Sequence, residues 1–217
     1  MPVLSFVSDT DVVRFAKALL DNRVETFNKD IAICLKADRD GSHAYFPALI
    51  TCIAFADFLS GLNAGTLTDQ KLPQLKAYVW QFIDNTRTVY TADCLDVLYE
   101  CFRHKLAHLA LPYAVFDTTT KSSKPSQTFY GQAQRLITWT VHARGPRPPI
   151  QIVGVGRTQI LKTPTPWPVF YDHRAIVSVS GLKSDIIKSI PKYLRYLETN
   201  HSARNHFKDC MQIYFPY

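Results

Sequence analysis

Apolar residues three and four positions apart mark the chain up to Pro112 as helical. The predicted helices cover about residues 9–35, 46–62, 69–83 and 91–110. Ser8 or Asp9 can cap the first. The second is apolar almost all round, so we expect it at the centre of a bundle. The fourth should end just before Pro112, because a proline disfavours helical geometry in the preceding residue. Four helices with short links favour an antiparallel four-helix bundle.

The pattern changes after Pro112, where β-branched and aromatic residues alternate with polar ones. The expected strands cover about residues 135–143, 150–155 and 174–180, and two closing helices cover about 182–199 and 202–214. We expect a kink or break at Pro191. The predicted fold is therefore mostly α. It comprises a helical bundle over residues 1–115 and a basic α+β extension over 116–217, with a small antiparallel sheet and closing helices packed on the bundle.

Composition places the chain among globular proteins, since its 217 residues are 47% hydrophobic and 20% charged. No stretch approaches the roughly 18 uninterrupted apolar residues of a membrane span, and the N-terminus does not resemble a leader. These features predict a soluble, cytoplasmic protein with no membrane partner. The five cysteines are odd in number and form no CxxC pair, which favours reduced, buried thiols.

The net charge of +7 is unevenly distributed. Residues 1–110 hold 11 Lys and Arg against 13 Asp and Glu, whereas residues 111–217 hold 14 against 5. A basic half favours a polyanion such as RNA, but it equally serves solubility or an acidic protein partner.

The end of the fourth predicted helix gathers the most potential chemistry. Arg103, His104 and His108 lie off its apolar stripe, and Glu100 stands three residues before Arg103 and four before His104. Histidine can transfer protons near neutral pH, and arginine offers a cationic fork to phosphate oxygens. These residue types fit metal-independent cleavage of an RNA phosphodiester. His108 would act as general acid or base, Arg103 would bind the phosphate, His104 would assist and Glu100 would orient.

The run Arg103-His104-Lys105-Leu106-Ala107-His108 resembles the motif of HEPN ribonucleases, in which Arg, a polar residue, a few more positions and His follow in order. The resemblance covers roughly residues 8–115, in helix number and order as well as in the motif. It implies a ribonuclease of toxin or anti-phage defence type, with a homodimeric cleft and an antitoxin or other protein partner. Candidate RNA-binding residues are Lys105, Arg144 and Arg147.

Spacing alone does not single out this pair, because Arg135 and His142, and Arg195 and His201, have similar separations. Five steps of 100° also place Arg103 and His108 about 140° apart on an α-helix. A shared site would therefore need the last turn to unwind, or a second chain to bring its own fourth helix alongside.

Three other interpretations stay open. The motif can be a solvated polar face whose ion pairs contribute only tenths of a kcal/mol. The bundle can be a non-catalytic HEPN-like module that dimerises or holds a nucleotide or protein. Residues 111–217 can bind nucleic acid through charge alone.

No cofactor or metal is expected from the sequence. His201, His206 and Cys210 have spacings reminiscent of metal ligands, but no fourth ligand lies near them. The chain has neither a glycine-rich phosphate loop with lysine nor a GxSxG elbow.

Overall fold

The computed structural model describes residues 6, 8–37, 44–68, 71–104, 116–117, 136–145, 147–160 and 169–215. The α-helices are α1 (Asp9–Cys34), α2 (Tyr45–Ala64), α3 (Leu72–Tyr78), α4 (Ala92–Val97), α6 (Val179–Thr199) and α7 (His201–Tyr214). Two π-helical segments, η1 (Val79–Ile83) and η2 (Leu98–His104), continue α3 and α4. The strands are β1 (Phe116–Asp117), β2 (Leu136–His142), β3 (Ile150–Ile160) and β4 (Val169–Ser178). The protein is mostly helical with a small sheet, as the sequence predicts.

Local capping explains where the first two helices begin and end. The side chain of Ser8 accepts a hydrogen bond from the backbone N–H of Asp11 at 3.2 Å and so caps α1, as predicted. Gly65 closes α2 with φ of +79°, a left-handed conformation that favours glycine. The chain stays helical through Pro191 within α6, so the alternative of a break there is wrong.

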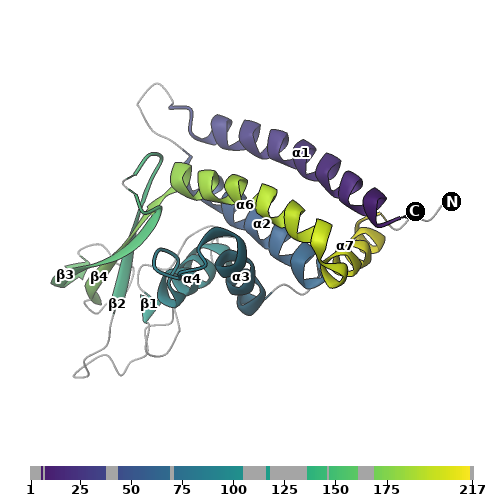
Figure 1. Ribbon diagram of the computed structural model, residues 1–217. Helices are drawn as coiled ribbons and strands as arrows, with labels where there is room; N and C mark the ends of the chain where they lie inside the picture. The colour runs from purple at the N-terminus through teal and green to yellow at the C-terminus, as the bar shows by residue number, and fades with distance from the viewer. Residues whose placement is uncertain are drawn as a thin grey trace.

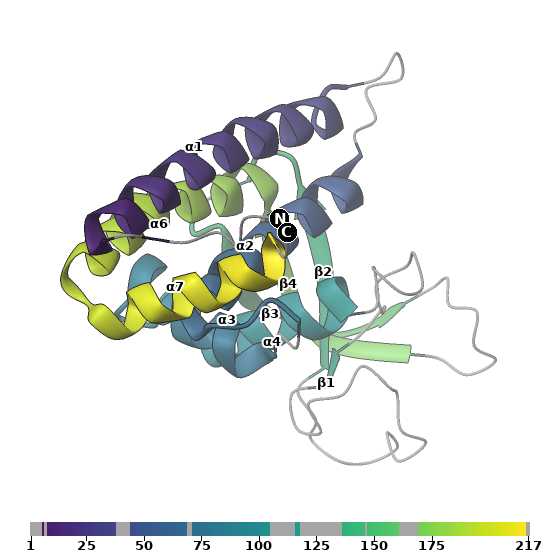
Figure 2. The same cartoon turned by 90° about the vertical axis from the view of Figure 1, so that its right-hand side faces the viewer.

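The apolar helix α2 lies at the centre of the helices, as its sequence predicts. It contacts α1, α3, η2, α6 and α7. Figures 1 and 2 show α1, α2 and α6 side by side, and in Figure 1 the sheet lies at the end of these helices away from the start of α1. Length and composition would allow α2 to cross a membrane, but 61% of its apolar window is buried inside the protein.

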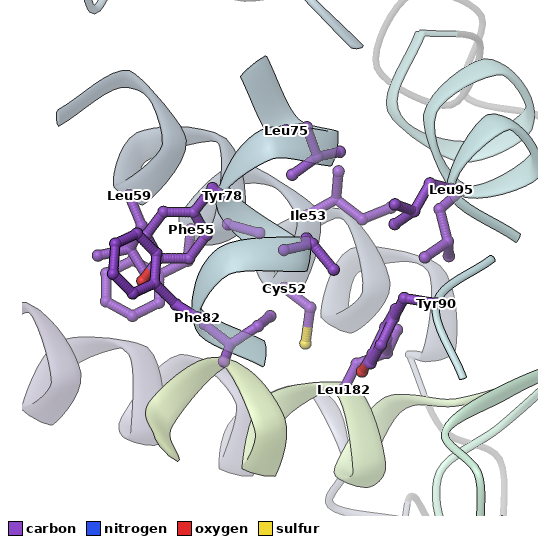
Figure 3. Close-up of a cluster of buried hydrophobic side chains, with 14 of the residues drawn as sticks. Cys52, Ile53, Phe55, Leu59, Leu75, Tyr78, Phe82, Tyr90, Leu95 and Leu182 are labelled. Atoms are coloured by element: carbon purple, nitrogen blue, oxygen red, sulfur yellow. The ribbon is translucent and has the colours of Figure 1, made fainter. Parts of the chain in front are cut away.

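One hydrophobic core joins the helices that precede the strands in the sequence to the helices that follow them. Side chains of α2, α3 and η1 meet those of α6, and Figure 3 shows Cys52, Tyr78 and Leu182 in this cluster. Trp139 of β2 attaches the sheet to the helices, because its ring packs edge-on against Phe46 at 5.3 Å and Phe102 at 5.6 Å between centroids. The predicted boundary between residues 115 and 116 adjoins the stretch 105–115, which lies outside the described residues.

The sheet is mixed, so the prediction of an antiparallel sheet is wrong. Its strand order is β1-β2-β4-β3, and β2 pairs with β4 in parallel while the other two pairs are antiparallel. Strand β4 takes the position between β2 and β3, with Ala175 and Val177 fully buried. Periodicity predicts that a segment is a strand, but pairing direction depends on contacts between segments distant in the sequence.

Two strands, β3 and β4, are longer than predicted. Strand β3 continues beyond Val155 because an irregularity in its pairing with β4, between Gly154 and Thr158, lets the ladder resume. Gly156 sits within it at φ of +72°. Gly154 and Gly156 thus accommodate a local irregularity within the strand.

Candidate functional site

Arg103, one of the predicted site residues, lies on η2, and its side chain contacts a carboxylate from another helix. Its Nε donates to Oδ2 of Asp57 on α2. The Arg103 side chain is 28% exposed and that of Asp57 only 9%, so the pair lies at the edge of the core with one face towards solvent. This ion pair joins α2 to η2.

Tyr99 holds the other side of the guanidinium. Arg103 Nη1 donates to the Tyr99 hydroxyl at 3.0 Å, and the guanidinium carbon lies 4.6 Å from the centroid of the Tyr99 ring. Burial raises the pKa of Tyr99, with the Arg103 charge opposing that shift, so the phenol stays protonated at neutral pH. A carboxylate and an aromatic ring therefore fix the orientation of Arg103 before any ligand binds.

Asp57 is a buried carboxylate whose burial is offset only in part by Arg103. Burial raises its pKa, and the hydrogen bond and charge of Arg103 lower it in part. Its Oδ1 is buried and has no hydrogen-bond partner among the described residues. A buried carboxylate of this kind depends strongly on the cation that pairs with it.

A second buried pair stabilises the same region. Asp96 of α4 is 3% exposed and pairs with Lys76 of α3. This pair joins α3 to the helix that continues into η2, and so supports the segment that carries Arg103.

The helix geometry at Arg103 differs from the α-helix assumed above. Residues Leu98–His104 are π-helical, with hydrogen bonds that span five residues rather than four. The calculated separation of about 140° between Arg103 and His108 holds for a regular α-helix. The steps from Arg103 to His108 run through residues 105–108, which lie outside the described residues, so this separation stays a prediction.

The remaining predicted catalytic residues are only partly described. The backbone of His104 ends η2, whereas His108 and Lys105 lie outside the described residues. Glu100 is half-buried on η2, and the carboxylate that pairs with Arg103 is that of Asp57. The roles of these residues stay predictions.

The two arginines predicted to bind RNA lie in the turn after β2. Both are exposed, and Arg147 Nη1 lies 3.8 Å from Oδ1 of Asp185 on α6. The histidine and cysteine of α7 that were considered as metal ligands face main-chain carbonyls of α2. His206 Nδ1 lies 2.8 Å from the oxygen of Asn63, and Cys210 donates to Gly61 at 3.4 Å. No group of three or more possible metal ligands occurs in the part of the chain that the structure describes.

Asp57 and Tyr99 are site residues that the sequence analysis missed. A signal for Asp57 exists, since it is the only charged residue within Tyr45–Ala64. A lone charge in a helix apolar all round predicts a buried ion pair, although it does not name the cation.

Comparison with known proteins identifies no relative of this chain: no family model matches it, and no curated protein or solved structure does so.

Proposed function

We propose that this protein is a HEPN-like, metal-independent endoribonuclease in which Arg103 binds the scissile phosphate and His108 transfers protons. The proposal includes a HEPN-like bundle as the scaffold. The observation that carries it is the preorganised Arg103 guanidinium, held by Asp57 and Tyr99 yet 28% exposed. Fixed cations stabilise charge that develops in a transition state without reorganising during the reaction.

The chemistry assigns one task to each group. His108 takes the proton from the RNA 2′-hydroxyl or delivers one to the leaving oxygen, and Arg103 neutralises charge on the phosphate. Asp57 is a positioning residue, since it holds Arg103 rather than touching RNA. A second copy of the chain in a homodimer would bring a second pair of these residues to the same cleft.

The test is RNA cleavage by the purified protein with EDTA present. We expect His108→Ala and Arg103→Ala each to lower the rate by about 10²-fold or more. Arg14→Ala is the matched control, because Arg14 is exposed on α1 and, among the described residues, pairs with a neighbour in its own helix, Asp11. Equal rates in folded Arg103→Ala, His108→Ala and unmodified protein would contradict the site, and a requirement for added metal would contradict the mechanism.

A non-catalytic HEPN-like module that binds a nucleotide, RNA or protein partner is the second candidate. The observation that favours it is that two nitrogens of Arg103 are already engaged by Asp57 and Tyr99. This candidate predicts that the protein cleaves no RNA and that Arg103→Ala alters only stability. Absence of cleavage together with a lower Tm for Arg103→Ala would favour it.

A further inference from the structure

A cavity of about 500 Å³ lies away from Arg103, between the loop after η1, the turn from β2 to β3, and α6. Its apolar walls include Phe82, Val89 and Pro148. Its charged walls include Arg147, Lys188 and Lys192. This volume falls in the range of small-molecule sites, which combine apolar walls with a few polar groups.

Backbone contacts hold the Arg147 side of this cavity in place. The N–H of Ser178 donates to the carbonyl oxygen of Pro149 at 2.7 Å. The Ser178 hydroxyl accepts from the N–H groups of Gly145 at 3.0 Å and Gly181 at 3.2 Å. A Cβ at Gly181 would lie 2.6 Å from Cβ of Pro149, so glycine permits this close approach. The turn is thus fixed to the start of α6.

The opposite side of the cavity is equally well supported. Asp84 accepts hydrogen bonds from the backbone N–H groups of Val89 and Tyr90, both at 2.8 Å. The Asp84 carboxylate is therefore engaged by backbone N–H groups of its own loop. The Tyr90 hydroxyl donates to Oδ2 of Asp185 at 3.1 Å, which joins this loop to α6.

The charges around the cavity leave an excess of cations at its edge. Asp185, Lys188 and Lys192 lie on one face of α6 at helical spacing. Asp185 accepts a hydrogen bond from the Tyr90 hydroxyl and faces Arg147. Among the described residues, neither exposed lysine has an ion-pair or hydrogen-bond partner. Two unpaired ammonium groups beside an apolar recess match a ligand with a doubly charged anionic group and a flat apolar body.

We propose that this cavity binds a small phosphate monoester whose apolar ring lies against Phe82 and Pro148, with its phosphate at Lys188 and Lys192. Inorganic phosphate would supply only the anion, and a nucleoside only the ring. A mononucleotide has both parts, so adenosine 5′-monophosphate is a suitable probe. The proposal does not depend on RNA cleavage, because Arg103 does not line this cavity.

The test is calorimetric titration of the full chain with adenosine 5′-monophosphate, inorganic phosphate and adenosine in turn. We expect the monophosphate to bind most tightly and, at 100 times its Kd, to raise Tm by about 5–10 °C. The double variant Lys188→Gln/Lys192→Gln should bind at least about tenfold more weakly while its Tm without ligand is unchanged. Lys183→Gln is the matched control, because Lys183 lies on α6 but does not line the cavity.

Each other result overturns the proposal. No binding of the monophosphate refutes the site. Inorganic phosphate binding as tightly would refute the contribution of the apolar wall, and adenosine binding as tightly would refute the contribution of the lysines. An equal loss in Lys183→Gln would show that general surface charge, rather than this cavity, attracts the ligand.

Discussion

Replacing Arg103 by methionine removes the cation that faces Asp57 while keeping much of the apolar length of the side chain. Breaking a fully buried ion pair costs about 3–5 kcal/mol, whereas exposed pairs contribute about 0–1 kcal/mol. Asp57 is 9% exposed and Arg103 28% exposed, which places this pair between those limits. We expect Arg103→Met to lower the free energy of unfolding by about 2–3 kcal/mol at pH 7, and Tm by about 4–12 °C.

The effect should depend on pH in a defined direction. Burial raises the pKa of Asp57 even beside Arg103, so the folded protein binds this proton at higher pH than the unfolded chain does. Stability from such a group is complete below the unfolded pKa of about 3.9 and is lost as the pH rises through the folded pKa. Without Arg103 that pKa rises further. The difference between the variant and the unmodified protein should therefore shrink as the pH falls from 7 towards 4.

The assay is urea unfolding at pH 7 and at several lower values, with Asp57→Asn and the double variant completing a cycle. We expect the double variant to be less destabilised than the two single changes together, because neither buried partner is left alone. Additive effects, or a difference between Arg103→Met and the unmodified protein that grows as the pH falls, would refute the reasoning.

Three further predictions concern the core and the thiols. Tyr193→Phe should leave the free energy of unfolding equal or up to about 1 kcal/mol higher in thermal unfolding, because its buried hydroxyl has no hydrogen-bond partner in the described structure. Tyr78→Phe should lower the free energy of unfolding by about 1 kcal/mol, because it removes a hydrogen bond to a serine of α6. The reverse order of stabilities would contradict this. Gly65→Ala should lower the free energy of unfolding by about 1–2 kcal/mol, since φ is +79° and a Cβ would lie 3.1 Å from a histidine ring of α7; unchanged urea unfolding would contradict it. Iodoacetamide at pH 8 should modify the half-buried Cys34 first, as followed by mass spectrometry, because burial raises the pKa of three other thiols to about 12. Earlier modification of any of those three would contradict this reasoning. Those three thiols are Cys52, Cys101 and Cys210.

The helices were predictable because their signals are local. The spacing of apolar residues and the cap at Ser8 lie within a few residues of the structure that they specify. The central place of α2 also follows from its own composition, since a helix that is apolar all round must be covered on every side. The π-helical turns of η1 and η2 were not predictable, because an apolar stripe is compatible with more than one hydrogen-bond pattern.

The candidate site was predictable only in part. The motif places Arg103 near the end of a helix, and the structure describes that residue on η2. Its partner Asp57 lies 46 residues earlier, so no local pattern connects the two. The cavity beside α6 was not predictable either. Its walls come from the loop after η1, the turn after β2 and α6, and those segments meet only in the folded chain.

The sequence by itself determined the helices, the position of most strands, the central role of α2 and the uneven charge. These properties depend on periodicity and composition, which neighbouring residues specify. The tertiary structure alone decided the parallel pairing of β2 with β4, the contact of Arg103 with Asp57 and the gathering of Arg147, Lys188 and Lys192 around one cavity. Those features join residues distant along the chain, and burial in a shared core selects their partners.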